Sequence, residues 1–332
     1  MKLFITGGAG FIGSNFIRYM LKKYPDYKII NYDKLTYAGN LNNLKDIEKS
    51  PRYKFVKGDI CDFKLASKYI KECDVVINFA AETHVDRSIL NADQFIKTSV
   101  NGTFALLEAS KFYNIERYIQ ISTDEVYGSI LKGSFTENSP ISPNSPYSSA
   151  KASADLLARS YFTTYGFPAI ITRCSNNYGP YQYPEKVIPL FVTNALDDIE
   201  VPLYGDGKNV RDWLFVLDHC RGIDIAMRKG KNGEVYNIGG GTELTNIELT
   251  KKVLEIVGKP LSLIKRVADR PGHDKRYSIN YSKIAKLGYK PAYKIEKALT
   301  ETVNWYMQNQ NIWRPLKDKD FKKYYNKQYK NK

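Results

Sequence analysis

Residues 2–13 read Lys-Leu-Phe-Ile-Thr-Gly-Gly-Ala-Gly-Phe-Ile-Gly, and this stretch decides the fold. The short apolar run from 2 to 6 predicts a strand, and the periodic apolar residues from 13 to 24 predict a helix. Between them, glycine recurs at every third position from Gly7 to Gly13. Glycine suits this turn because the chain bends tightly and a pyrophosphate can approach the backbone beside the unpaired N–H groups of a helix N-terminus. The stretch therefore predicts a dinucleotide site.

An acidic residue follows the second predicted strand, which covers residues 28–32. Asp33 stands 20 residues beyond Gly13. At this spacing a carboxylate accepts hydrogen bonds from ribose hydroxyls and repels a 2′-phosphate. The sequence therefore favours NAD over NADP, although the adjacent Lys34 could soften that preference. The structural alternative is a glycine turn and a surface aspartate that bind nothing.

Apolar strands alternate with amphipathic helices over the first half of the chain, which predicts an α/β fold with a doubly wound parallel Rossmann sheet. We assign residues 1–174 to this NAD-binding domain. The predicted strands cover residues 2–6, 28–32, 54–56, 74–79, 117–121 and 169–173, and the predicted helices cover 13–24, 95–112 and 149–165.

Prolines and glycines interrupt this rhythm after Cys174. We assign residues 175–332 mainly to a smaller, interleaved C-terminal lobe that binds the substrate and ends in a basic tail. Within 212–240 we expect two strands, at 212–216 and 235–238, that return to the main sheet. Helices are predicted at 244–257 and 295–308.

The composition excludes several classes of protein. Apolar residues make up 43% and charged residues 26% of the 332 residues, as in ordinary globular proteins. No apolar run approaches the ~18 residues that span a bilayer, and the apolar start is too short for a secretory signal. We therefore expect a cytoplasmic protein without a membrane partner. The four cysteines form no C-x-x-C and the three histidines are scattered, so no metal site is expected.

The net charge of +15 raises the question of an anionic macromolecular partner. Arg314 to Lys332 hold eight basic and two acidic residues, interleaved with aromatic residues. We interpret this stretch as a solvated tail and expect no nucleic-acid partner, because base-stacking residues usually line a rigid groove. A basic binding protein built on a Rossmann scaffold is the alternative from another functional class.

Two motifs predict redox and acid–base chemistry. Tyr147 and Lys151 form a Y-x-x-x-K, whose spacing places both side chains on one face of a helix. A tyrosine is a poor base at neutral pH, and we expect the Lys151 ammonium and a positive nicotinamide ring to favour its phenolate. Thr123, Asp124 and Glu125 follow the fifth predicted strand, at the sheet edge where parallel sheets bind ligands. The structural alternative is a pair of exposed helix residues and a solvated acidic pair.

Together these motifs resemble the extended short-chain dehydrogenase/reductase family, and within it the sugar-nucleotide 4,6-dehydratases. The Asp124-Glu125 pair beside the Y-x-x-x-K is the specific part, since sugar epimerases of the family lack it. Thr83 stands where family members often carry serine. The segments that carry the resemblance are the glycine turn and residues 33–41, 80–88, 123–128, 147–151, 173–180, 204–213 and 270–274.

The resemblance implies a lyase that converts dTDP-glucose to dTDP-4-keto-6-deoxyglucose, as in deoxysugar or rhamnose biosynthesis. Tyr147 would take the proton of the 4-hydroxyl, oriented by Thr123, while NAD⁺ accepts the C4 hydride. Glu125 would remove the C5 proton, and Asp124 would protonate the departing 6-hydroxyl. NADH would then return the hydride to C6. Lys151 would hold the nicotinamide ribose.

The resemblance and the motifs also name the ligand contacts. We expect the cofactor to contact Gly7, Gly10, Phe11, Ile12, Gly13, Asp33, Lys34, Leu35, Thr36, Asp59, Ile60, Phe79, Ala80, Ala81, Thr98, Tyr147, Lys151 and Asn177. We expect the substrate to contact Thr83, Thr123, Asn176, Lys186, Val187, Pro202, Tyr204, Arg211, Asn246, Arg270 and His273.

The resemblance further implies a homodimer joined by a four-helix bundle, to which residues 95–112 and 149–165 would contribute. Three matters stay open at this stage. A sugar-nucleotide 4-epimerase needs the same glycine turn and Y-x-x-x-K without the elimination pair. The residues do not distinguish a dTDP-sugar from a UDP- or CDP-sugar. The pathway that uses the product is not determined.

Overall fold

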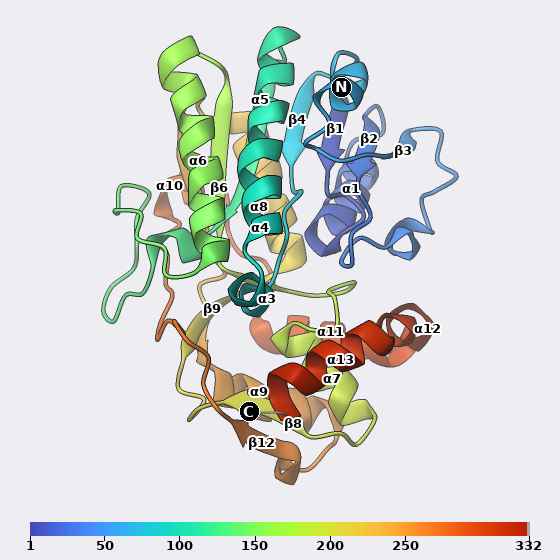
Figure 1. Ribbon diagram of the computed structural model, residues 1–332, viewed down its shortest axis with the longest axis vertical. Helices are drawn as coiled ribbons and strands as arrows, with labels where there is room; N and C mark the ends of the chain where they lie inside the picture. Colours follow the sequence, from blue (N-terminus) through green and yellow to red (C-terminus); the bar gives the residue numbers. More distant parts are fainter. Residues whose placement is uncertain (331–332) are drawn as a thin grey trace.

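The computed structural model describes residues 1–330 and consists of two lobes (Figure 1). A seven-stranded sheet in the order β10-β6-β5-β4-β1-β2-β3 forms the core of the larger lobe. All its neighbouring strands are parallel. The predicted doubly wound parallel sheet is therefore confirmed. Its strands are β1 (Lys2–Thr6), β2 (Lys28–Asp33), β3 (Tyr53–Lys57), β4 (Val75–Asn78), β5 (Arg117–Thr123), β6 (Ala169–Cys174) and β10 (Val235–Ile238).

Helices bury both faces of this sheet. Leu3 and Ile5 of β1 pack in one cluster with side chains of α1 (Phe11–Lys23) and α8 (Val216–Lys229). Phe4, between them, packs on the opposite face with side chains of α5 (Thr103–Phe112) and α6 (Pro146–Tyr165). A strand that is covered on both faces needs a continuous apolar run. The sequence contains continuous apolar runs because these strands are buried on both faces.

The helices that flank the site differ from the prediction in detail. The single helix expected over 95–112 consists of α4 (Asp93–Ile96), a π-helical turn η2 (Lys97–Gly102) and α5. α6 starts three residues earlier than expected, because the Ser145 side chain accepts a hydrogen bond from the Ser148 N–H and Pro146 occupies the first turn. The early start places Tyr147 inside the helix.

The second lobe contains two small sheets. β7 (Asn176–Tyr178), β9 (Val210–Phe215) and β11 (Glu243–Thr245) form one, and β8 (Val201–Tyr204) pairs with β12 (Ile264–Val267) in the other. The expectation that the strand near 212–216 returns to the main sheet is wrong, because β7 and β11 occupy both edges of β9. The strand at 235–238 does return, as β10 beside β6.

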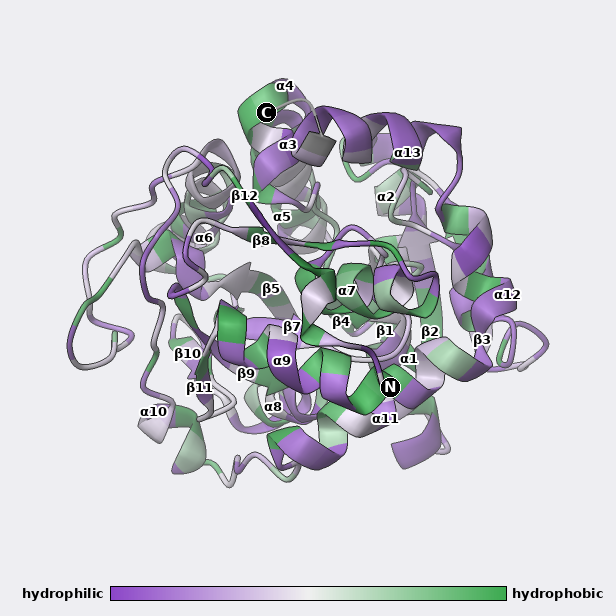
Figure 2. Ribbon diagram, turned by 90° about the horizontal axis from the view of Figure 1, so that it is seen from below, coloured by the Kyte–Doolittle hydropathy of each residue, from purple (hydrophilic) through white to green (hydrophobic). Residues whose placement is uncertain are grey.

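Three longer helices cover these small sheets: α7 (Val187–Leu196), α9 (Asn246–Val257) and α11 (Ile295–Gln308). In Figure 2, α9 and α11 are striped, with hydrophobic residues along one side and hydrophilic residues along the other. Residues 188–195 of α7 are all buried. The remaining short elements are α2 (Phe63–Ile70), α3 (Val85–Leu90), α10 (Ser282–Ala285), α12 (Gln310–Trp313), η1 (Leu41–Leu44), η3 (Asp124–Tyr127), η4 (Leu261–Leu263) and η5 (Arg314–Leu316).

The basic C-terminal stretch is not a solvated tail, so that expectation is wrong for the part of it that the structure describes. It folds as α13 (Lys319–Tyr325) and η6 (Asn326–Lys330), which lie across the second lobe (Figure 1). Phe321 and Gln328 are buried. The aromatic residues recur at helical spacing and so form one apolar face, while Lys319, Lys322, Lys323 and Lys327 are exposed. Asn331 and Lys332 lie outside the described residues.

No helix within residues 1–330 combines the length and the apolar character that crossing a membrane requires.

Candidate active site

A cavity opens at the carboxyl ends of β1 to β6 and extends to the start of α7. Ligands bind at this edge of an open parallel sheet, beside the point where the strand order reverses. β1 and β4 are neighbours in the sheet although β2 and β3 separate them in the chain. The cavity therefore lies where the sequence predicts the dinucleotide.

The glycine turn forms one wall of this cavity. Gly7 has a φ of +66°, and a Cβ on it would lie 2.7 Å from the backbone nitrogen of Ala80. A Cβ on Gly13 would lie 2.5 Å from the Gly7 carbonyl oxygen. Gly10 differs, because the nearest atom to its Cβ would be 3.3 Å away, at the Gly7 carbonyl. Gly7 and Gly13 thus allow the backbone to pack, while Gly10 keeps the wall open for a ligand.

Asp33 lies at the carboxyl end of β2 and faces the same cavity. Its carboxylate accepts hydrogen bonds from the backbone N–H groups of Ala9 at 2.9 Å and Leu35 at 2.8 Å. Burial raises the pKa of Asp33, and these two bonds oppose the rise. The bond to Ala9 ties the carboxylate to the glycine turn.

Lys34 does not compete with Asp33. Its ammonium forms a 2.8 Å ion pair with Asp59, which lines the cavity at the end of β3. This hydrogen bond raises the pKa of Lys34. Because Asp59 already neutralises the ammonium, Lys34 is a poor partner for a 2′-phosphate, which agrees with the preference for NAD.

Every residue expected to contact the cofactor lines the cavity except Leu35. Leu35 takes part through its backbone N–H, which holds Asp33, and its own φ is +59°. Thr98 reaches the cavity from the π-helical turn η2. Such turns occur often at functional sites.

The acid pair lies at the end of β5. Thr123 caps the short helix η3, since its hydroxyl accepts a hydrogen bond from the Glu125 N–H at 3.2 Å. The same hydroxyl donates to Oδ1 of Asp124 at 3.2 Å. The second oxygen of Asp124 is buried without a hydrogen-bond partner among the described residues.

The electrostatic surroundings separate the two acids. Burial and the neighbouring charge of Glu125 raise the pKa of Asp124 well above its usual value. Burial also raises the pKa of Glu125, but the positive charges of Arg270, Lys186 and Arg211 oppose that rise. Asp124 therefore holds a proton more readily than Glu125 does.

Tyr147 and Lys151 line the same cavity from α6. The Tyr147 ring packs edge-to-face against Phe95, with 6.3 Å between ring centroids. The Lys151 ammonium is buried and donates a 2.6 Å hydrogen bond to the Ile121 carbonyl on β5. This bond joins the helix of the Y-x-x-x-K to the strand that precedes the acid pair.

The expected effect of Lys151 on Tyr147 is not found in the protein alone. Burial and the negative charge of Glu125 raise the pKa of Tyr147 well above its usual value, and a hydrogen bond with Thr123 opposes the rise. Burial lowers the pKa of Lys151. The protein by itself therefore keeps Tyr147 as a phenol.

Four of the residues expected to contact the substrate line the cavity, and the others lie outside it. The four that line the cavity are Thr83, Thr123, Asn176 and Lys186. Arg270 and Tyr204 both bond to Asp86 at the junction of the lobes, and Arg211 donates to the Asp274 carbonyl at 2.9 Å. The residues outside the lining are Val187, Pro202, Tyr204, Arg211, Asn246, Arg270 and His273.

Several residues of the site were not predicted from the sequence. Gln182 and Tyr183 line the cavity from a loop whose prolines and glycines show no ligand pattern. Glu82 stands inside the quoted segment 80–88, which was a usable signal. From the C-terminal stretch, the Tyr324 hydroxyl bonds to Nδ1 of His84 just before α3, and Gln328 donates to the Tyr204 hydroxyl. No group of His, Cys, Asp or Glu side chains within residues 1–330 has the arrangement of a metal site.

Comparison with known proteins identifies the family. A sequence model of the family GDP-mannose 4,6 dehydratase matches residues 4–302. The chain belongs to this dehydratase family. This dehydratase-family chain is 51% identical to the dTDP-glucose 4,6-dehydratase of an Actinoplanes species over 94% of its own length and 100% of the relative. It is 50% identical to the dTDP-glucose 4,6-dehydratase of Streptomyces niveus, over 96% of this chain and 97% of the relative.

Solved structures extend the comparison of this dehydratase-family chain. DesIV, a dTDP-glucose 4,6-dehydratase from Streptomyces venezuelae with NAD and TYD bound, superposes with a TM-score of 0.94 at 52% identity. That match covers 95% of this chain and 100% of DesIV. UDP-glucose 4-epimerase from Thermotoga maritima has a TM-score of 0.87 at 31% identity, over 93% of this chain and 100% of the epimerase. The chain thus shares its fold with an epimerase, but its sequence identity to the dehydratase is higher than its identity to the epimerase.

Proposed function

We propose that the protein is an NAD-dependent dTDP-glucose 4,6-dehydratase, a hydro-lyase. One observation carries the proposal: the Asp124-Glu125 pair and the Tyr147-Lys151 pair line one cavity that the glycine turn also lines. An epimerase needs the tyrosine and the glycine turn, but it has no use for an acid and a base that eliminate water. The similarity of about 50% to curated dehydratases over nearly the whole chain supports the same activity.

The residues around the glycine turn fit NAD. Gly10 keeps the wall open, the N-terminus of α1 lies beside it, and Asp33 stands where a ribose would bind. When bound, NAD accepts a hydride from C4 of the sugar and returns it to C6, and its positive ring favours the phenolate of the nearby tyrosine. Lys151, which lines the same cavity, would hold the nicotinamide ribose.

Tyr147 and Thr123 act on the sugar 4-hydroxyl. Tyr147 removes its proton as C4 is oxidised to a ketone, and the Thr123 hydroxyl orients the oxygen. The Thr123 hydroxyl opposes the rise in the pKa of Tyr147 that burial causes. The new ketone acidifies the proton on C5, which allows a carboxylate to remove it.

Asp124 and Glu125 then eliminate water across C5 and C6. Glu125, whose charge Arg270 and Lys186 stabilise, takes the C5 proton, while Asp124 donates its proton to the departing 6-hydroxyl. The electron pair of the C5–H bond forms the C5–C6 double bond as the C6–O bond breaks. After the hydride returns to C6, Glu125 gives the proton back to C5. The hydride taken from C4 ends on C6, so the only net change is the loss of one water. The product is dTDP-4-keto-6-deoxyglucose.

The positive groups beside the acid pair suit the nucleoside diphosphate. Arg270, Arg211 and Lys186 all lie close enough to Glu125 to influence its pKa. A guanidinium binds two phosphate oxygens at once. The net charge of +15 is consistent with an anionic substrate, and the described part of the C-terminal stretch packs against its own protein through Phe321 and Gln328.

We further propose a homodimer through α5 and α6, which stand side by side in Figure 1. Leu106 and Leu107 of α5 are buried against the sheet. Other large apolar side chains of the two helices remain exposed, including Phe104, Leu156 and Tyr165, at 50% or more. Two copies of this face would bury them in a four-helix bundle. Sedimentation at low concentration tests this proposal, and a monomer refutes it. The cytoplasmic location stays a prediction.

The experiment that tests the activity follows labelled atoms. With dTDP-glucose carrying deuterium on C4, the product should carry that deuterium on C6, and in deuterated water C5 should gain one solvent deuteron. Nuclear magnetic resonance of the products distinguishes these positions. A product that is only inverted at C4 indicates an epimerase, and loss of the C4 label to solvent refutes the internal hydride return. UDP-glucose in a parallel reaction tests the choice of base.

A further inference from the structure

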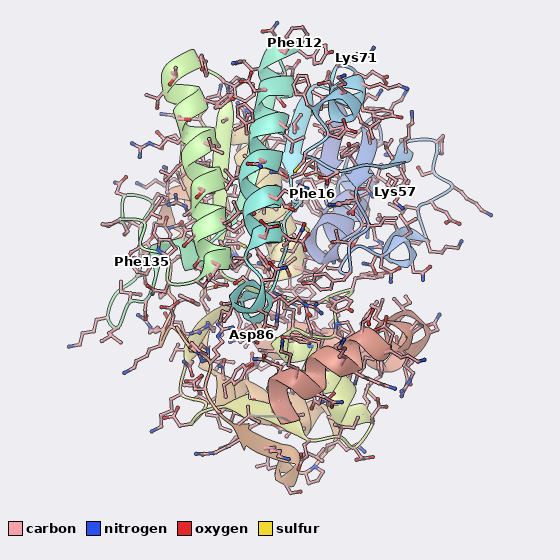
Figure 3. All side chains as sticks on the ribbon, viewed as in Figure 1. Phe16, Lys57, Lys71, Asp86, Phe112 and Phe135 are labelled. Atoms are coloured by element: carbon pink, nitrogen blue, oxygen red, sulfur yellow. The ribbon has the colours of Figure 1, made fainter. Side chains whose placement is uncertain are left out.

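The short helix α3 lies at the junction of the two lobes, where Figure 3 labels Asp86. It follows β4 and so belongs to the first lobe by chain order. Two consecutive side chains of this helix, Asp86 and Arg87, nevertheless bond to residues of the second lobe. Neither residue was expected to contact a ligand, and neither lines the cavity.

Asp86 holds two residues that are expected to contact the substrate. Its Oδ1 accepts a hydrogen bond from Nη1 of Arg270 at 3.0 Å, and its Oδ2 accepts one from the Tyr204 hydroxyl at 2.9 Å. The carboxylate is 3% exposed, so water does not screen this ion pair. Nε2 of Gln328 donates to the same Tyr204 oxygen at 2.6 Å. Tyr204 is therefore fixed from both lobes.

Arg87 makes the parallel connection to the loop before α7. Its Nε donates to Oε2 of Glu185 at 2.8 Å, and its guanidinium stacks on the rings of Tyr37 at 4.0 Å and Tyr324 at 4.5 Å. Glu185 directly precedes Lys186, which lines the cavity. The bonds of α3 therefore hold Arg270 directly, and they also hold the residue that precedes Lys186 in the chain.

Arg270 keeps donors free for a ligand. Its Nε is buried and has no hydrogen-bond partner within the described residues. A guanidinium has five N–H donors, and Asp86 takes one of them. The charge of Arg270 also acts on Glu125, so the guanidinium that Asp86 holds is near enough to influence a residue of the cavity. An anion that enters here would meet an arginine that is already oriented.

We propose that Asp86 is a positioning residue for the nucleoside diphosphate: it holds Arg270 and Tyr204 across the lobe junction in the arrangement that binds dTDP. The proposal rests on the proposed function and deepens it. Groups that are already oriented lose little side-chain freedom on binding, which strengthens the complex. The reacting groups line the cavity and Asp86 lies outside it. The loss of Asp86 should therefore weaken substrate binding far more than it slows turnover.

The test compares Asp86→Asn with Asp224→Asn in the full-length, NAD-loaded enzyme. Asp224 is a matched control, because it is buried, pairs with Lys23 and accepts from tyrosine hydroxyls, but joins α1 to α8 away from the cavity. Titration calorimetry with dTDP should give a Kd about 10- to 100-fold higher for Asp86→Asn. The KM for dTDP-glucose should rise by a similar factor, whereas kcat should stay within about threefold of the wild-type value. Asp224→Asn should keep the wild-type Kd.

A double-mutant cycle separates positioning from general damage. With Arg270→Lys as background, Asp86→Asn should weaken dTDP binding much less than it does alone, because both changes remove the same arrangement. If Asp86→Asn does not fold, Asp86→Glu retains the charge but displaces the carboxylate, and it should weaken dTDP binding by the same mechanism.

Three results would overturn the proposal: an unchanged Kd in a folded Asp86 variant, an equal loss in Asp224→Asn, or additive effects in the cycle. Failure of the proposed function has a different signature. A wild-type enzyme that binds dTDP but does not convert dTDP-glucose refutes the function, and the binding comparison still decides the role of Asp86. A wild type that does not bind dTDP overturns both proposals.

Discussion

Asp124→Asn should divide the reaction at the elimination step. The substitution keeps the size of the side chain and replaces a carboxyl that can give up its proton by an amide that cannot. Asp124 is 2% exposed, and burial with the charge of Glu125 raises its pKa well above the usual value. Both effects favour the protonated form of the wild-type residue, which is the form that an acid for the 6-hydroxyl needs.

The magnitude follows from the contacts of this carboxyl. Its Oδ1 accepts from Thr123 at 3.2 Å, a bond that the asparagine oxygen can retain, so the orientation of Thr123 should persist. Only the proton transfer is lost, and such a transfer is worth about 10²–10⁴ in rate. We therefore expect overall kcat to fall by about 10³, the middle of that range, while oxidation at C4 falls by less than about tenfold.

The assay is a single-turnover reaction followed by the near-ultraviolet absorbance of reduced nicotinamide, with product analysis in parallel. Asp124→Asn should accumulate NADH and the 4-keto sugar, whereas wild type should not. Asp218→Asn is the control for loss of a buried carboxyl, since Asp218 instead accepts from the backbone N–H groups of Ala292 and Tyr293. Turnover of Asp124→Asn within tenfold of wild type, or no NADH, would remove Asp124 from the acid role.

Four further substitutions test other parts of the site. Tyr147→Phe should lower the rate of C4 oxidation by about 10²–10⁴ with no accumulation of NADH, and stopped-flow absorbance that still shows reduction would contradict this role. Glu125 must be ionised to act as base, and its pKa is raised, so kcat should fall as pH decreases through that raised value. If Glu125→Gln still loses activity at low pH in the same way, a group other than Glu125 causes that loss. Gly10→Ala should weaken NAD binding with little change in Tm, whereas Gly13→Ala should lower Tm because its Cβ meets the Gly7 carbonyl at 2.5 Å; equal Tm losses would refute the distinction.

The local parts of the site were predictable because they follow from short spacings. Glycines three apart, an acidic residue after the second strand and a tyrosine four residues before a lysine each act within one turn or one strand. Residues at the ends of β4 and β5 were predictable because parallel strands end at the same edge. The pKa of Tyr147 was not, because burial and the charge of Glu125 outweigh the expected effect of Lys151.

The sequence by itself determined the parallel sheet, the glycine turn, the Y-x-x-x-K and the Asp124-Glu125 pair, since periodicity and spacing along one chain segment specify them. Only the tertiary structure decided that β9 leaves the main sheet, that the C-terminal stretch packs on the second lobe, and that Asp86 meets Arg270, 184 residues away. The physical reason is that such contacts depend on how the two lobes pack together. The same local pattern of apolar and polar residues is compatible with many relative arrangements of the lobes. A buried carboxylate then selects one of them, because it must find its cation and its hydroxyl donor.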